Sequence, residues 1–275
     1  MQSLISKPYR YALVVEYNGK NFAGSQKQPE LRTVQSELEN ALNILLKNNV
    51  KTVFSGRTDK GVHSKGQIVH FDSENMIDLH RFNYSLNSLL PLDMSVPEIN
   101  ETDEHFHSQK SAKFRWYRYI INNGSQRSVW LNESLNISTP LNLNLMNQAL
   151  AYIVGEHDFN SFKGSSSSNP ARVCNMYKAE CKRENNLIII DLAANRFLYN
   201  MIRIIVGTLL PIGKGVNPPE SILDILNKQD RKAAGPTALA DGLTLMYVGY
   251  EEKYNTLNLL NKEAINYENL FCEAS

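Results

Sequence analysis

The sequence predicts an α+β protein made of two halves, each with the element order β-α-β-β-α-β. Three observations predict it: strand-like stretches alternate with apolar residues at helical spacing, the pattern occurs twice, and polar turn-forming residues separate the elements. Two ferredoxin-like halves would place two mixed or antiparallel sheets side by side. A central cleft between them is the natural place for a large ligand.

The first half is expected to span residues 1–105. Tyr9–Tyr17 is rich in Tyr, Val and Leu and predicts the first strand. Thr33 is placed to cap a helix, because apolar residues follow it at helical spacing: Val34, Leu38, Ala41, Leu42 and Leu45. The later elements of this half are strands at 51–54, 67–71 and 94–99 and a helix at 78–89.

The second half, 106–250, repeats the order. The elements expected are strands at 113–121, 173–181, 187–193 and 243–250 and helices at 143–154, 197–210 and 219–228. Residues 164–170, with four consecutive serines, predict a flexible loop, and 251–275 form a polar tail without an assigned element.

The composition is that of a soluble globular protein, with 42% hydrophobic and 21% charged residues among 275. The net charge of +1 excludes a uniformly basic RNA coat but allows a basic stripe on one face. Three cysteines without a C-x-x-C pair predict reduced thiols in a cytoplasmic protein. The cysteines and histidines do not have the spacing of a zinc site, so no metal site is predicted.

Two segments bear on targeting and membranes. The N-terminus lacks the charged region, apolar run and cleavage site of a secretory signal. The most apolar stretch, Phe197–Gly213, is short for a bilayer and carries Asn200 and Arg203 in its middle, so it predicts a buried helix.

The segment Gly56–Ser64 lies between two expected strands and has Arg57 and Asp59 two residues apart. Its glycines allow an unusual backbone path, and loops on a rigid scaffold often carry catalytic groups. The alternative is an ordinary connection in which Gly and Asp only form turns.

Two other segments suit RNA. The loop 16–29 contains Phe22 between Lys20 and Lys27, a combination that could stack on bases and contact phosphates, unless Phe22 packs into the local core. In the strand that follows residue 112, alternation puts cations and tyrosines on one face, at Lys113, Arg115, Tyr117 and Tyr119. We expect that face to bind single-stranded or looped RNA; the alternative is a solvated edge strand.

Arg203 lies among apolar residues and needs a partner if it is buried. Asp59 is a candidate partner, and the alternative is that Arg203 reaches the surface from an amphipathic helix. The small residues Ala233–Leu245 would let other backbone or a ligand come close.

Taken together, these segments resemble the bacterial tRNA pseudouridine synthase A family over nearly the whole chain. The matching blocks, in order, are Tyr17-x-Gly19 with Phe22 and Gln26, Thr33-Val34-Gln35, Gly56-Arg57-Thr58-Asp59-x-Gly61-Val62-His63, Gly66-Gln67, Phe71, Asn87, Leu90-Pro91, Phe106-His107, Ser111-Ala112, Tyr117-x-Tyr119, Phe197-Leu198, Met201-x-Arg203-x-Ile205-Val206-Gly207, Gly235-Pro236-Thr237-Ala238 and Gly242-Leu243.

The resemblance implies the pseudouridine synthase fold, an RNA-binding cleft, and isomerisation of uridine to pseudouridine at positions 38, 39 and 40 of the tRNA anticodon stem-loop. It implies a homodimer in the cytoplasm, without metal or organic cofactor. Asp59 matches the catalytic aspartate, which could attack C6 of uracil or C1′ of the ribose. Arg57 and Arg203 match basic residues around it, and Arg57 is the candidate for flipping the base.

The substrate-binding residues expected on these grounds are Tyr117, which matches the tyrosine that packs on the target base, Leu243, Phe22, Gln26, Lys113, Arg115 and His63. Two positions depart from the family: Ser25 replaces the usual tryptophan, and Gln109 an arginine. Both departures put contacts with RNA in doubt rather than the chemistry.

Three alternative functions predict different features of the chain. A non-catalytic RNA-binding protein on the same scaffold would not need Asp59, whereas a pseudouridine synthase with another RNA target would keep the same pocket. A glycosidase of free nucleosides predicts a small closed pocket, which the basic strand and the 20–27 loop do not suit.

Overall fold

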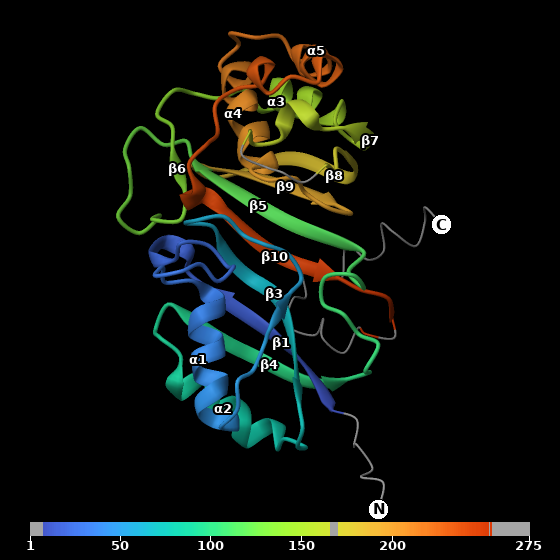
Figure 1. The fold of residues 1–275 in the computed structure, drawn as a ribbon. Helices are drawn as coiled ribbons and strands as arrows, with labels where there is room; N and C mark the ends of the chain where they lie inside the picture. The colour runs from blue at the N-terminus through green and yellow to red at the C-terminus, as the bar shows by residue number, and fades with distance from the viewer. Residues whose placement is uncertain (1–7, 166–169, 253, 255–275) are drawn as a thin grey trace, which may run out of the picture. The chain divides into compact units, whose positions relative to one another are not determined.

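The computed structural model describes residues 8–165, 170–252 and 254. Strands and helices both recur along the chain, which confirms the predicted α+β class (Figure 1). By their contacts the residues form two compact units, one of Met1–Lys113 with Met246–Ser275 and the other of Phe114–Leu245. We refer to them as unit 1 and unit 2.

Unit 1 has the predicted order β-α-β-β-α-β. Its strands are β1 (Tyr9–Tyr17), β2 (Val53–Phe54), β3 (His63–Ser73) and β4 (Met94–Thr102), and its helices are α1 (Val34–Leu46) and α2 (Leu79–Leu89). β1 pairs antiparallel with both β3 and β4, and β2 pairs antiparallel with β3. The register places Val14 opposite Ile68 on one side and Glu98 on the other.

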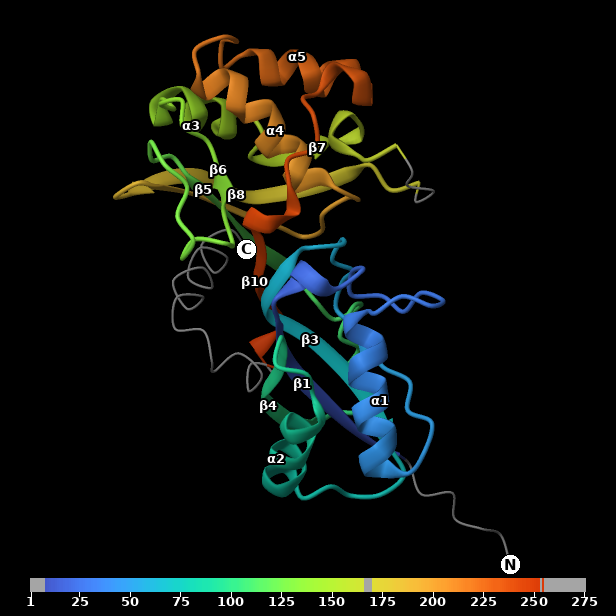
Figure 2. The same ribbon diagram turned by 90° about the vertical axis from the view of Figure 1, so that its left-hand side faces the viewer.

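Helices α1 and α2 cover one face of the unit 1 sheet (Figures 1 and 2). The core between them takes alternate residues of β1, namely Tyr11, Leu13, Val15 and Tyr17, because successive side chains of a strand point to opposite faces. Thr33 caps α1 as predicted: its Oγ1 accepts a hydrogen bond from the Ser36 N–H, and Ser36 Oγ accepts one from the Thr33 N–H. The predicted apolar face of α1 is in this core.

Unit 2 contains most of the remaining elements. Its strands are β5 (Phe114–Asn122), β6 (Leu135–Asn136), β7 (Gly155–Asp158), β8 (Val173–Glu184) and β9 (Leu187–Ala194), and its helices are α3 (Leu143–Ala151), α4 (Met201–Gly213) and α5 (Ser221–Lys228). The strand order is β5-β9-β8-β7 with antiparallel neighbours, and short β6 runs parallel to β5. The three helices lie on one side of this sheet (Figure 2).

Helix α4 is the buried helix that the sequence predicts, with ten of its residues in the interior. It begins at Met201 rather than at residue 197, because Asn200 has a left-handed backbone (φ 58°) that interrupts helical geometry. The small residues before the last strand allow the predicted close approach: a Cβ added to Gly235 would lie 2.6 Å from the Gly207 carbonyl oxygen of α4.

The last strand, β10 (Leu243–Gly249), passes from unit 2 into unit 1. The division expected from the sequence, 1–105, 106–250 and 251–275, and the arrangement of two halves around a cleft stay predictions. Most of the 251–275 tail and residues 166–169 of the serine loop lie outside the described residues.

One expectation about β5 is wrong. Tyr119 is not part of an exposed RNA-binding face: it is fully buried, and its hydroxyl donates to the Leu239 carbonyl oxygen at 2.7 Å. The opposite face of β5 is also covered: Trp116 is fully buried, and its Nε1 and Arg118 Nε each donate to Asp191 Oδ1 at 2.9 Å. Strand alternation separates two faces, but it does not reveal that both are packed.

Candidate active site: the aspartate loop

The loop between β2 and β3, which we call the aspartate loop (residues 55–62), is held by hydrogen bonds at Ser55, Gly56, Thr58, Asp59 and Val62. Ser55 N–H donates to the Ile68 carbonyl oxygen at 2.8 Å, and Gln67 Nε2 donates to the Gly56 carbonyl oxygen at 2.9 Å. Gln67 is fully buried, so this amide is a fixed part of the interior. The loop therefore leaves β2 along a defined path.

Thr58 is the buried centre of the aspartate loop. Its Oγ1 lies 2.8 Å from the Tyr17 hydroxyl, and both side chains are buried. Burial raises the pKa of Tyr17 to about 12, although its hydrogen bonds to Thr58, Gln67 and Ser64 act in the opposite direction. The hydroxyl is thus neutral at physiological pH and can both donate and accept.

The backbone of Thr58 is bound as firmly as its side chain. Ser25 N–H donates to the Thr58 carbonyl oxygen at 3.1 Å, and Thr58 N–H donates to Ser25 Oγ at 2.8 Å. Gly24 has a φ of +108°, and a Cβ there would lie 2.9 Å from the Thr58 carbonyl oxygen. The 22–26 segment and the aspartate loop therefore touch backbone to backbone.

A tight turn follows at Asp59. Val62 N–H donates to the Asp59 carbonyl oxygen at 3.1 Å, and Gly61 has a φ of +84°, as the third residue of a type II turn requires. Arg57 is exposed and Asp59 is half-buried, whereas Thr58 between them is buried. The loop thus presents two charged side chains on an anchored backbone.

His63 follows the turn and links it to the loop after β1. Its Nδ1 accepts from the Gly19 N–H at 3.1 Å, and its side chain is buried. A Cβ on Gly19 would lie 2.0 Å from the Val62 carbonyl oxygen, so only glycine fits there. His63 therefore holds two loops together, and the prediction that it binds substrate receives no support from its position.

The prediction that Phe22 stacks on a base is wrong. Phe22 is 1% exposed, its ring lies edge-on to Tyr17 with centroids 6.2 Å apart, and the Arg32 guanidinium carbon is 4.2 Å from its centroid. Two later residues of the same loop, Gln26 and Lys27, are exposed. The alternative reading, an aromatic residue that anchors its loop in the core, is the correct one for this side chain.

The remaining predicted residues are distributed over both units. In unit 1, Lys113 is exposed and its Nζ pairs with Glu251 Oε1 at 2.7 Å. In unit 2, Arg115 Nη1 donates to the Asn195 carbonyl oxygen at 2.8 Å, and the Tyr117 ring lies edge-on to Phe197 with centroids 5.3 Å apart. Leu243 is buried at the start of β10.

Arg203 is tied to the segment before β10. Its Nε donates to the Ala238 carbonyl oxygen at 2.7 Å, its own carbonyl oxygen accepts from the Ala238 N–H at 3.0 Å, and its Nη1 donates to Asn200 Oδ1 at 3.0 Å. The side chain is half-buried. The predicted ion pair with Asp59 would join the two units and stays a prediction.

The model of the tRNA pseudouridine synthase family matches residues 13–109 and 149–251, which include the aspartate loop, Arg203 and Leu243. This chain belongs to that family. Its members are isomerases that act on tRNA, so the enzyme class and the resemblance seen in the sequence are both confirmed.

Relatives of the family match over most of their length. The tRNA pseudouridine synthase A of Geobacillus kaustophilus (strain HTA426) is 41% identical over 252 residues, 89% of this chain and 95% of the relative. That of Buchnera aphidicola subsp. Acyrthosiphon pisum (strain APS) is 41% identical over 248 residues, covering 89% and 92%. That of Vibrio campbellii (strain ATCC BAA-1116) is 39% identical over 246 residues, covering 89% and 93%.

Among solved structures, a chain from "Crystal Structure of a Cbf5-Nop10-Gar1 Complex" matches at 10% identity. The match covers 88% of this chain and 60% of the other. The TM-score of this match is 0.34.

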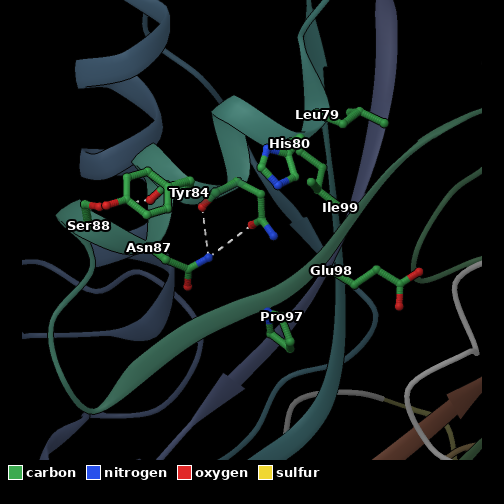
Figure 3. A pocket seen from close by; sticks show the side chains of 9 residues that line it. Leu79, His80, Tyr84, Asn87, Ser88, Pro97, Glu98 and Ile99 are labelled. Carbon is green, nitrogen blue, oxygen red and sulfur yellow. Dashed lines mark hydrogen bonds between the residues drawn. The ribbon is translucent and has the colours of Figure 1, made fainter.

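Unit 1 of this family member also has a groove of about 670 Å³ between α2 and β4 (Figure 3). Asn87 fixes its wall, because its side-chain amide donates to the Val96 carbonyl oxygen and accepts from the Val96 N–H, both at 2.8 Å. None of the predicted site residues lines this groove. Within the described residues no group of three or more His, Cys, Asp or Glu could hold a metal ion, and no helix is long and apolar enough to cross a membrane.

Sequence reasoning missed the three residues that support the aspartate: Tyr17, Ser25 and Thr58. Thr58 and Tyr17 were within the matched motifs, but their spacing along the chain gives no sign of contact. The signal available was chemical, since a hydroxyl residue between Arg57 and Asp59 needs a partner if its neighbours face outward.

Proposed function

We propose that this enzyme isomerises uridine to pseudouridine at positions 38, 39 and 40 of the tRNA anticodon stem-loop, with Asp59 as the nucleophile. One observation carries the proposal: in a member of this family, Asp59 stands half-buried on a loop whose backbone is bound on both sides of it. A carboxylate held in this way loses little freedom when it meets the substrate.

The reaction rearranges bonds within one nucleotide. The bond from N1 of uracil to C1′ breaks, the base turns, a bond from C5 to C1′ forms, and the C5 hydrogen leaves as a proton while N1 gains one. The Asp59 carboxylate supplies an electron pair for either of two steps, addition to C6 of the base or attack on C1′. Both routes use the same carboxylate.

The target uridine must leave the stem-loop stack before either step, at a cost of a few kcal/mol. Arg57 is exposed two residues before Asp59 in the chain. We propose that its side chain fills the space that the flipped base leaves. Tyr117 would pack on the flipped base and Leu243 would line the pocket. Gln26, Lys113 and Arg115 are the candidates for contacts with the RNA backbone, since cations and amides suit phosphate oxygens.

We assign Arg203 to Asp59 as a charge partner. Replacing it with Leu would also remove the bond from its Nε to the Ala238 carbonyl oxygen, so Arg231→Leu is the matched control: Arg231 Nη1 donates to the Gly235 carbonyl oxygen at 2.9 Å in the same segment. Arg203→Leu is expected to lower the single-turnover rate at least about 100-fold. Equal rates in the two variants would show that Arg203 only holds the segment.

Tritium release from C5-labelled uracil tests the proposal directly. The substrate is an unmodified transcript of a tRNA with uridines at positions 38 to 40. Asp59→Asn is expected to lower the rate by at least about four orders of magnitude while tRNA affinity stays within about tenfold. Asp224→Asn, at an exposed site of α5, is the control and should release tritium normally.

The outcomes separate the alternatives. Release from the wild type that persists in Asp59→Asn would remove Asp59 from the mechanism. Tight tRNA binding without release would favour another RNA target, the second candidate function. We further propose a cytoplasmic homodimer; a sedimentation velocity run that gives the mass of one chain at micromolar concentration would contradict it.

A further inference from the structure

Ser25 is a buried serine whose polar groups are directed at the aspartate loop. It is 1% exposed, and it exchanges two hydrogen bonds with Thr58, one from its own N–H and one to its Oγ. The sequence led us to expect that this departure from the family affects contacts with RNA. That expectation stays a prediction, and the Ser25 side chain itself has almost no exposed surface.

The bond to Ser25 Oγ depends on the chemistry of the side chain. Thr58 N–H needs an acceptor at 2.8 Å, which a hydroxyl supplies and which alanine or the donor-only indole of tryptophan does not. An unsatisfied buried N–H costs about 1–3 kcal/mol. Without this acceptor, a shift of Thr58 toward water would therefore lower the free energy of the loop.

Ser25 is itself fixed from the other side by helix α1. Its carbonyl oxygen accepts from the Gln35 N–H at 3.0 Å, and the Gly24 carbonyl oxygen accepts from the Val34 N–H at 3.3 Å. These are N–H groups of the first turn, which otherwise lack partners within the helix. A continuous chain of bonds thus runs from the start of α1 through Ser25 to the peptide that precedes Asp59.

We propose that Ser25 is a positioning residue for Asp59: its Oγ fixes the Thr58 peptide and thereby the point from which the Asp59 carboxylate reaches the substrate. This inference rests on the proposed role of Asp59 as nucleophile. Its consequence is kinetic, because a displacement of about 1 Å at a reacting group can lower a rate about 100-fold. Substrate affinity depends on other residues and is unaffected.

The test compares Ser25→Ala, Ser25→Thr and Ser161→Ala under single-turnover conditions with C5-tritiated tRNA. Ser161 is the matched control, since it is fully buried and its Oγ donates to the Ile225 carbonyl oxygen at 2.6 Å in unit 2. Ser25→Ala is expected to lower the rate constant about 10- to 100-fold while the Kd for tRNA changes less than about threefold. Ser25→Thr keeps the acceptor and should recover most of the rate.

Three results would overturn the inference: a Ser25→Ala rate within threefold of the wild type, an equal loss in Ser161→Ala, or no recovery in a folded Ser25→Thr. Ser25→Cys, with a weaker acceptor in nearly the same volume, gives an intermediate rate if the bond matters and replaces Ser25→Ala if that variant does not fold.

Parallel assays of the wild type and Asp59→Asn keep the two proposals apart. If the wild type releases tritium, Asp59→Asn does not, and Ser25→Ala matches the wild type, only the role of Ser25 is wrong. If the wild type releases no tritium from tRNA, or Asp59→Asn still releases it, the proposed function fails first.

Discussion

The Tyr17 hydroxyl and Thr58 Oγ1 lie 2.8 Å apart in the interior of unit 1, and this contact joins the end of the first strand to the residue before the candidate nucleophile. Tyr17 ends β1, whose position is set by its pairing with both β3 and β4. The aspartate loop is therefore attached to a strand that has a partner on each side, in addition to its contact with the 22–26 segment.

Tyr17→Phe removes this bond, together with those to Gln67 and Ser64, and leaves the ring in place. We expect the free energy of unfolding to fall by about 1–2 kcal/mol, because the Thr58 hydroxyl loses a buried partner. The single-turnover rate should fall as well, since the loop loses an anchor next to Asp59. Chemical denaturation and tritium release measure the two effects; Tyr84→Phe, at a side chain 76% exposed, should change neither.

Gly19→Ala tests the close approach of the two loops. The added Cβ would lie 2.0 Å from the Val62 carbonyl oxygen, so the backbone of one loop must shift. We expect a loss of about 1–3 kcal/mol in stability, as for other overpacked sites, together with a reduced rate.

Gly56→Ala is the control for that experiment. It lies on the aspartate loop, which Gly19 contacts, has no atom within 4 Å of an added Cβ, and is not at a positive φ. Its stability should stay unchanged or rise by up to about 1 kcal/mol, because alanine restricts the unfolded chain. Equal losses in both variants would mean that the loop contact does not limit stability.

The sequence predicted the elements well because their signals are local. The apolar spacing from Val34 to Leu42 and the hydroxyl of Thr33 specify α1 and its start within thirteen residues of chain. Asn200 shows the limit of such signals, since a residue that fits a helical pattern takes a left-handed conformation that only the folded chain imposes.

The sequence singles out the proposed reactive residues of the candidate site but not the residues that support them. Arg57 and Asp59 stand in a motif of adjacent residues, whereas Ser25 and Thr58 meet across 33 positions of chain. Phe22 and Tyr119 failed for a related reason: the exposure of an aromatic side chain depends on what tertiary structure places over it, which alternation along one strand does not encode.

Asp191 is expected to be the most sensitive charged residue of unit 2. It is 2% exposed and accepts from Trp116 Nε1 and from Nε and Nη2 of Arg118. Asp191→Ala leaves a partly buried guanidinium and a buried indole N–H without this acceptor, so we expect a loss of about 3–5 kcal/mol. Glu180→Gln, which breaks a surface pair with Lys178, should cost less than about 1 kcal/mol. Similar losses in both would contradict the assignment.

His70 predicts how stability depends on pH. Its Nδ1 accepts from the Ser108 N–H at 3.2 Å and lies 2.9 Å from Ser108 Oγ, and burial lowers its pKa from 6.5 to about 4, helped by Arg10 and His107. Between these two values the unfolded chain binds a proton that the folded chain does not. The contribution of His70 to the free energy of unfolding is therefore fully present above about pH 6.5. It is lost as the pH falls toward 4, by at most about 3 kcal/mol.

The variant His70→Asn keeps an acceptor for the Ser108 N–H but cannot titrate, so its free energy of unfolding should change less between pH 7 and pH 4 than that of the wild type. His80→Asn, at an exposed histidine of α2, should retain the wild-type slope. Urea denaturation at a series of pH values measures all three proteins. If His70→Asn and the wild type lose stability in parallel down to pH 4, His70 is not the group whose protonation opposes folding, and the acid sensitivity comes from carboxylates instead.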